Sequence, residues 1–367
     1  MRAGGEVRRG LDVLLALALG VLAWLAPGLG ARSGRALVLN LGPNDADYVR
    51  GFREDWERLG RTRFHWTTLS STIRLPARLA GEGHLLRMRA RRHFVEPALV
   101  QLSAEGRAVA PPFSISADTK VPYRVLEIPL APLQGREPFQ LRIDVHSDNP
   151  RPLGVALDWI EVDPRGSAAR VIPLPLVRLA LVAVVLAAFA APRLAGGGRV
   201  LAASHAGLVL VAALLALAHD LVAADRMLRQ GAATYVFMAA LAVLLVRWAP
   251  LRRALALEDG RAGAVLTVAL LAGLALRLAL LLDPQFFYPD VRVHANMAWQ
   301  LHRRGLMNFL REFTVSQYRF SLGLQFENGH WYAFPYPPAF YLLCWPLLKL
   351  GFRPEVAVSL LGAAANS

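Results

Sequence analysis

The hydrophobic residues of the chain are gathered in long blocks that charged stretches separate. Apolar runs cover 11–31, 174–192, 200–218, 231–246 and 262–282, and a shorter run covers 337–350. The first five are close to the roughly 20 residues that a helix needs to cross a hydrocarbon core of about 30 Å. This pattern predicts a polytopic α-helical membrane protein. The sixth run is short and is interrupted by Pro346, so it is marginal as a spanning helix.

Between the first and second blocks, from 36 to about 163, apolar and polar residues alternate with a period of two. Examples are HLLRMRA at 84–90, YRVLEIPL at 123–130 and FQLRIDVH at 139–146. Such short alternating segments, bounded by Gly, Pro, Asp and Asn, predict β-strands with one buried face. Their spacing is typical of a two-sheet antiparallel sandwich, and about 130 residues suffice for a core of its own. We therefore expect an inserted all-β sandwich of jelly-roll type.

These patterns divide the chain into five parts. We expect a membrane anchor or signal peptide at 1–31, a β-sandwich domain at 32–168, membrane helices at 171–282, an external loop with an amphipathic interfacial helix at 283–336, and a membrane helix followed by the start of another at 337–367. The last segment is too short to cross a bilayer, so we expect the chain to be part of a longer protein.

The distribution of basic residues predicts which side each part faces. Arginines cluster at 193–199 and 247–261, whereas the residues between the third and fourth blocks balance two Arg with Asp220 and Asp225. By the positive-inside rule, the two clusters are cytoplasmic, and alternation of sides also puts Lys349 inside. The β domain, a loop at 219–231 and the segment 283–336 are then extracytoplasmic. We expect an integral protein of a bacterial inner or plasma membrane.

Composition narrows the function classes. Apolar residues make up 55% of the chain and charged residues 19%, unlike an ordinary soluble enzyme. The net charge of +14 is almost all arginine and is spread without a block, so we expect no nucleic-acid partner. A single cysteine, Cys344, rules out an intramolecular disulfide. No Walker A, dinucleotide, HExxH or serine-elbow motif is present, so we expect no nucleotide cofactor.

The strongest candidate for chemistry is Asp290, just after the fifth block. It starts an amphipathic stretch in which Val293, Met297 and Leu301 recur at helical spacing. One interpretation is a simple helix N-cap. The other is a carboxylate held at the membrane surface, where it could accept a proton or bind a divalent cation.

Three features then follow one another in a fixed order: Asp290, the amphipathic HANMAWQLHRRGL at 294–306, and PYPPAFYLLCWPLLKL at 335–350. In this order the chain resembles the type C superfamily of integral-membrane glycosyltransferases (GT-C). The resemblance implies transfer of a sugar from a polyprenyl-phosphate donor to a glycan or protein acceptor on the external face, with Asp290 as general base or acceptor-orienting group. It departs from the superfamily at Val291, where many members carry a second acidic residue.

Four further residues are candidate substrate-binding groups. Arg277 lies about six residues inside the end of the fifth block, where a guanidinium could hold a lipid-linked phosphate or simply extend to the interface. Arg292 could attract anionic head groups or pyrophosphate. His294 follows Asp290 by four residues and could line the substrate or join a metal pair. Tyr336 could stack on a sugar or belong to an aromatic interface belt.

An alternative function is a non-catalytic membrane-anchored protein of envelope assembly whose sandwich binds glycans. The aromatic side chains of Trp56, Trp66 and Trp159 could line a carbohydrate groove in that domain. Strand aromatics are also common core residues, so both interpretations stay open.

Overall fold

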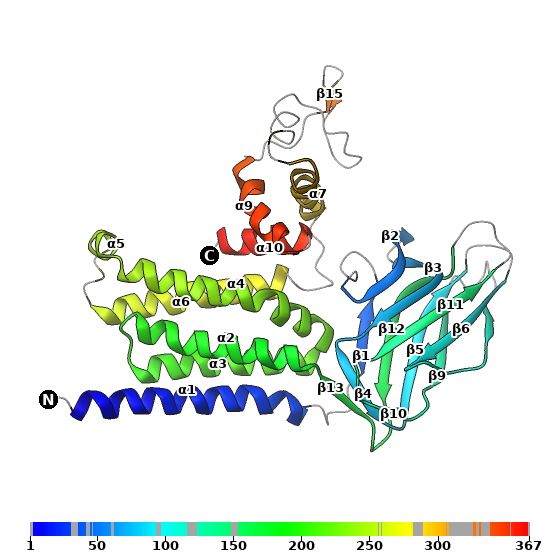
Figure 1. Cartoon of the computed structure of the whole chain (residues 1–367), viewed down its shortest axis with the longest axis horizontal. Coiled ribbons are helices and arrows are strands. Elements are labelled where there is room, and N and C mark those ends of the chain that lie inside the picture. Colours follow the sequence, from blue (N-terminus) through cyan, green and yellow to red (C-terminus); the bar gives the residue numbers. More distant parts are fainter. Residues whose placement is uncertain are drawn as a thin grey trace.

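The computed structural model describes residues 3–365 except 31–35, 42–44, 46, 60–61, 93–96, 116–122, 148–152, 256, 258, 282–288, 306, 308–325, 328–329, 332–337 and 353. Within these residues the chain forms a helical bundle and a β domain at one end of it (Figure 1). The coarse prediction of long apolar helices plus an antiparallel β domain is thus confirmed.

Five helices are long and apolar enough to cross a membrane, by length and composition. They are α1 (Ala3–Gly30), α2 (Pro175–Leu194), α3 (Arg199–His219), α4 (Leu221–Arg247) and α6 (Gly260–Leu281). Small residues and leucines from all five of these helices, such as Ala188, Ala206 and Ala239, form one buried cluster. Small side chains at helix contacts let the backbones approach closely, which is a common device in membrane bundles.

The fourth helix begins earlier than its apolar block suggests. Asp220 caps α4, because its Oδ1 accepts hydrogen bonds from the backbone N–H groups of Val222 and Ala223 at 2.9 and 3.0 Å. The stretch expected as an external loop at 219–231 is therefore mostly helix. At 27 residues, α4 is about 40 Å long, roughly 10 Å more than a hydrocarbon core, so its first turns can extend beyond it.

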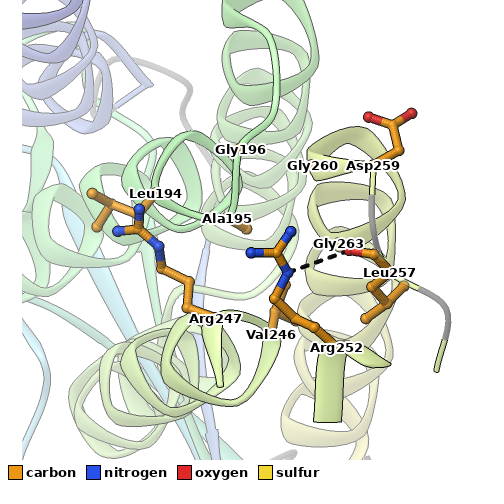
Figure 2. A pocket seen from close by; sticks show the side chains of 10 residues that line it. All are labelled: Leu194, Ala195, Gly196, Val246, Arg247, Arg252, Leu257, Asp259, Gly260 and Gly263. Carbon is orange, nitrogen blue, oxygen red and sulfur yellow. Dashed lines mark hydrogen bonds between the residues drawn. The ribbon is translucent and has the colours of Figure 1, made fainter. Parts of the chain in front are cut away.

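The end of the bundle away from the β domain carries the arginine clusters. The α2–α3 turn, the short helix α5 (Ala249–Ala254) and the start of α6 meet there (Figure 2). Arg193 and Arg199 both bind Asp12 of α1, with N···O distances of 2.7 Å each. The β domain and the arginine clusters thus lie at opposite ends, as the charge pattern predicts.

The C-terminal helices differ from the expected alternation of sides. α9 (Pro338–Lys349) has only 12 residues, about 18 Å, and the turn that follows it lies against Asp47 and Gln230 at the β-domain end. Lys349 was expected on the opposite side, and this is a correction: α9 is too short to carry the chain across. The helix α7 (Pro289–Arg304) packs Met297 and Leu301 against α9 and against α10 (Pro354–Ala365).

The β domain is a curled antiparallel sheet. Its strands are β1 (Leu37–Asn40), β2 (Val49–Leu59), β3 (Thr62–Arg74), β4 (Ala77–Gly81), β5 (His84–Arg91), β6 (Ala98–Ala104), β7 (Arg107–Ala108), β8 (Phe113–Ile115), β9 (Arg124–Pro129), β10 (Leu133–Gln134), β11 (Gln140–His146), β12 (Ala156–Pro164) and β13 (Arg170–Pro173), with a separate hairpin of β14 (Phe326–Glu327) and β15 (His330–Trp331). The ten-stranded sheet has the order β7-β6-β11-β3-β12-β5-β9, with β1, β2 and β8 paired beside it. β10, β4 and β13 form a second, three-stranded sheet. β13 lies past residue 168, where the predicted domain ends.

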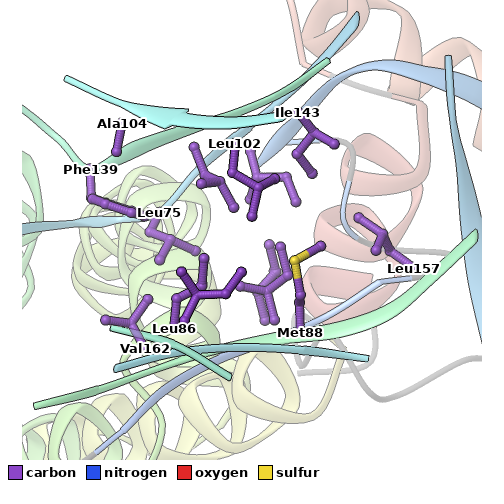
Figure 3. Close-up of a cluster of buried hydrophobic side chains, with 14 of the residues drawn as sticks. Leu75, Leu86, Met88, Leu102, Ala104, Phe139, Ile143, Leu157 and Val162 are labelled. Atoms are coloured by element: carbon purple, nitrogen blue, oxygen red, sulfur yellow. The ribbon is translucent and has the colours of Figure 1, made fainter. Parts of the chain in front are cut away.

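Side chains from facing strands fill the interior of this curl. β5 alternates buried and half-buried residues along its length, and Leu86 and Met88 point inward from it toward Leu102 and Ile143 (Figure 3). Val222 of α4 joins the same core. The alternation read from the sequence thus supplies the buried face, and the first turn of α4 contributes to it from outside the domain.

The arrangement predicts a sided labelling pattern. In a variant whose single cysteine, Cys344, is replaced by Ser, a Cys at Gly198 should react with membrane-impermeant maleimide only after the membrane is opened, whereas a Cys at Arg107 should react directly. Gly198 suits the test because a Cβ there meets nothing within 4 Å, whereas at Gly197 it would lie 2.7 Å from the Cβ of Ala264. Labelling of Gly198→Cys from outside intact cells would show that the chain has the opposite orientation in the membrane.

Candidate functional site at the junction of the two domains

Buried polar groups join the β domain to the start of α4. The hydroxyl of Tyr48, just before β2, lies 3.0 Å from Oδ2 of Asp225 and 3.1 Å from the carbonyl oxygen of Val222. Tyr48 is 3% exposed and Asp225 is fully buried. Burial, together with the negative charge of Asp225, raises the pKa of Tyr48 well above its ordinary value. The hydroxyl therefore keeps its proton and can donate it to either acceptor.

The charge of Asp225 is balanced within its own helix. Arg229, one turn further along α4, donates from Nε to Oδ1 at 2.7 Å and from Nη2 to Oδ2 at 2.5 Å. This two-bond geometry is the strong form of an arginine–carboxylate pair. The same guanidinium lies 5.9 Å from the ring centre of Tyr48. The three side chains form one unit that fixes the β domain on the bundle.

A second buried pair holds the loop that carries Tyr48. Nδ1 of His65 on β3 lies 2.8 Å from Oδ2 of Asp45, and Nε2 lies 2.5 Å from the carbonyl oxygen of Arg53. Because both ring nitrogens face oxygen acceptors, an imidazolium that donates from both satisfies the arrangement. The loop from Asp45 to Tyr48 is thus anchored on both sides, which positions Asp47 at the edge of the junction.

Next to this network is a cavity of about 260 Å³, which we call the junction cavity. It is lined by Asp47 of the β domain, Gln230 of α4, and Leu350, Gly351, Phe352 and Val356 around the α9–α10 turn. Nε2 of Gln230 donates to Oδ2 of Asp47 at 2.6 Å, and Oε1 of Gln230 accepts from Nε of Arg226 at 3.3 Å. The cavity thus combines a carboxylate and an oriented amide with an aromatic and aliphatic wall.

The structure gives different outcomes for the site residues expected from sequence. Asp290 and Arg292 lie in the first turn of α7, but their side chains are outside the described part of the structure, and so is the whole of Tyr336. Arg277 is half-buried one turn before the end of α6, and its Nη1 would lie 3.6 Å from a Cβ placed on Gly273. The expected grouping of these residues around one substrate stays a prediction.

His294 is the candidate whose surroundings are described. Its Nδ1 lies 2.7 Å from the hydroxyl of Tyr341, a fully buried residue of α9, and its ring contacts Phe340. His294 therefore helps to pack α7 on α9. Pairing of His294 with Asp290 in a metal site stays a prediction, because the side chain of Asp290 is outside the described part of the structure.

The three tryptophans that the sequence suggests for a carbohydrate groove differ in their surroundings. Trp66 and Phe64 are each 5% exposed and pack edge to face, with Tyr123 beside them. They form a small satellite core, so Trp66 is not part of an open groove. Trp159 is half-buried on β12, and the side chain of Trp56 is outside the described residues.

Sequence reasoning missed the residues of the junction. Asp225 and Arg229 were taken as charges of an external loop, and Asp47, Tyr48 and Gln230 were not singled out. The available signal was the spacing of four between Asp225 and Arg229 after a capping Asp220, which is a helical ion-pair pattern. Nothing in the sequence indicates that a tyrosine 177 residues away completes it.

Comparisons with known proteins find similarity in solved structures. No family model and no curated protein sequence matches the chain. Among solved structures, a family 35 carbohydrate binding module from Clostridium thermocellum is 12% identical, with a TM-score of 0.27, over 35% of this chain and 97% of that module. The CBM36-1 domain of a multidomain xylanase from the hindgut metagenome of Trinervitermes trinervoides is 12% identical, with a TM-score of 0.27, over 36% and 99%. The C-terminal CBM6 of a marine laminarinase from Zobellia galactanivorans is 11% identical, with a TM-score of 0.25, over 35% and 99%. Similarities at this level assign no function.

Proposed function

We propose that this chain is a membrane-anchored protein that binds a glycan on the extracytoplasmic face, with the junction cavity as the binding site. The observation that carries the proposal is the chemistry of the cavity wall. Sugar hydroxyls both donate and accept hydrogen bonds, and a carboxylate beside an amide offers them both kinds of partner. Phe352 offers an apolar surface that suits the C–H face of a sugar ring.

Size and position support the same proposal. About 260 Å³ is just below the range of 300–1,000 Å³ that is usual for small-molecule sites, so one or two sugar units are the scale of ligand to expect. The cavity lies at the end of the bundle that carries the β domain, opposite the arginine clusters. By the positive-inside rule this end faces the extracytoplasmic side. Envelope glycans lie on that side.

A prediction for Asp47 tests the site. Asn has the size of Asp and can still accept the hydrogen bond from Gln230, but it lacks the negative charge. A hydrogen bond to a charged group contributes about 1.5–3 kcal/mol, so Asp47→Asn should weaken glycan binding by roughly tenfold to a hundredfold. Calorimetric titration of the purified chain in nanodiscs with N-acetylglucosamine, xylose and glucose oligosaccharides measures this.

The matched control is Glu127→Gln, which removes a carboxylate from the exposed face of β9, far from the cavity in sequence and structure. Its affinity should equal that of the wild type. The proposal fails if the wild type binds none of these oligosaccharides, or if Asp47→Asn and Glu127→Gln bind as tightly as the wild type.

A second candidate function is glycosyl transfer from a polyprenyl-phosphate sugar, the activity that the GT-C resemblance implies. The specific observation in its favour is that 289–304 does form an amphipathic helix, with Met297, Ala298 and Leu301 buried and Trp299 exposed. Asp290 stands in its first turn. Glycan binding and transfer are compatible, since a transferase must also hold its acceptor; turnover with a labelled donor distinguishes them.

A further inference from the structure

A second cavity, of about 140 Å³, lies at the other end of the bundle (Figure 2). The last turn of α4, the short helix α5, the α2–α3 turn and the start of α6 enclose it. Its lining residues are Leu194, Ala195, Gly196, Val246, Arg247, Arg252, Leu257, Asp259, Gly260 and Gly263. We call it the arginine cavity, because two guanidinium groups are its main polar groups.

Glycines make this cavity possible. Gly196 has a φ of +101°, and a Cβ on it would stand 3.0 Å from the Cα of Gly260. A Cβ on Gly263 would stand 2.6 Å from Cγ1 of Val246. The α2–α3 turn therefore approaches α6 at backbone distance, and the side chain of Val246 from α4 packs directly on Gly263, where a Cβ would collide with it. This gives the glycine run after α2 a structural purpose, namely a narrow wall opposite the arginines.

The two arginines present positive charge to that wall. Figure 2 shows the guanidinium group of Arg252 directed toward the α2–α3 turn and that of Arg247 toward Leu194. Nε of Arg252 donates to the carbonyl oxygen of Leu257 at 3.4 Å, which orients the group. None of the described residues forms an ion pair with Arg247. Nearby, Asp12 pairs with both Arg193 and Arg199.

The acidic residue of the lining does not cancel this charge. Oδ1 of Asp259 accepts the backbone N–H of Arg261 at 2.9 Å and so caps the start of α6. Its carboxylate points away from both guanidinium groups (Figure 2). The N-terminal end of α6, with its positive partial charge, also faces the cavity through Gly260 and Gly263. Two guanidinium groups and a helix N-terminus thus line the cavity, and both are groups that bind anions.

We infer that the arginine cavity binds a phosphate group, carried by an anionic phospholipid of the cytoplasmic leaflet or present as free phosphate. Guanidinium groups match phosphate with parallel hydrogen bonds. Trp248, which is 58% exposed between α4 and α5, marks this level as the membrane interface, where lipid phosphates lie. Basic pockets between helices on the cytoplasmic side are suited to acidic head groups. This inference does not depend on the proposed glycan function.

The test compares the whole chain with Arg247→Gln/Arg252→Gln in nanodiscs. One arm measures the rise in melting temperature when phosphatidylglycerol is added to phosphatidylcholine, and the other adds inorganic phosphate in phosphatidylcholine alone. The double variant should need about thirtyfold more of the anion for the same rise, because each arginine near the surface contributes roughly fivefold. Arg253→Gln is the control, since Arg253 is exposed on the same helix but does not line the cavity.

The arms separate the two sources. A rise with phosphatidylglycerol alone assigns a lipid head group, and a rise with inorganic phosphate as well assigns the phosphate group itself. Equal melting temperatures of all variants in phosphatidylcholine show that the fold is intact. If folding of the double variant is impaired, Arg252→Lys replaces it: lysine keeps the charge but not the two parallel hydrogen bonds of a guanidinium group, so the rise in melting temperature with the anion should be intermediate. A response that is equal in the wild type and the double variant, or absent from both, overturns the inference.

Discussion

Replacing Asp225 by Ala is expected to lower the free energy of unfolding by about 3–5 kcal/mol. Asp225 is fully buried, and its two oxygens accept from Arg229 and lie near the hydroxyl of Tyr48. Without the carboxylate, the Arg229 charge stays at the junction without this partner. Leaving a buried charge uncompensated costs more than the pair itself contributes. The substitution should therefore loosen the β domain from α4 as well as destabilise the bundle.

The double variant separates this explanation from simple loss of packing. If an orphaned charge causes the effect, Asp225→Ala/Arg229→Ala should be more stable than Asp225→Ala, despite losing more atoms. Equilibrium unfolding in detergent, followed by circular dichroism, gives the free energies of unfolding of the wild type, Asp225→Ala, Arg229→Ala and the double variant. Asp163→Asn is the control, since its pair with Arg165 lies on the surface and should contribute at most about 1 kcal/mol. Strictly additive losses at the two sites would refute the charge explanation.

Elements with a strong period were predictable from the sequence. The alternation of 84–90 places Leu86 and Met88 on one face, and the structure buries both. The long apolar blocks likewise became helices. In these segments the same pattern specifies both the element and its buried side, so local sequence is sufficient.

The start of α4 and the turn after α9 were not predictable in this way. At α4, Asp225 and Arg229 read as solvated charges, because burial of a charge depends on a partner that only the fold supplies. At α9, the count of crossings assumed that each apolar block changes side, and a 12-residue helix does not. Both differences arise from tertiary contacts between distant segments, which hydropathy does not encode.

The candidate site shows the same limit. Single-residue arguments identified Asp290 and His294 as candidates, and the structure adds that His294 packs against Tyr341. The junction cavity is made by Asp47, Gln230 and Phe352, which lie far apart in the sequence and belong to three different elements. No motif joins them, so only the assembled structure brings a carboxylate, an amide and an aromatic ring to one place.

Asp290→Asn is expected to slow sugar transfer by about 10²–10⁴-fold, if the protein transfers sugar with Asp290 as its general base. As a structural residue, Asp290 stands in the first turn of α7, which begins at Pro289. There its charge complements the helix dipole, and this interaction contributes only about 0.3–1 kcal/mol.

A structural role of Asp290 thus predicts a small change in stability and unchanged turnover. The measurement is transfer of radiolabelled sugar from polyprenyl phosphate at matched expression, with Glu327→Gln as a control acid from the same segment between α6 and α9. Wild-type turnover in Asp290→Asn would remove Asp290 from catalysis and leave glycan binding as the function to pursue.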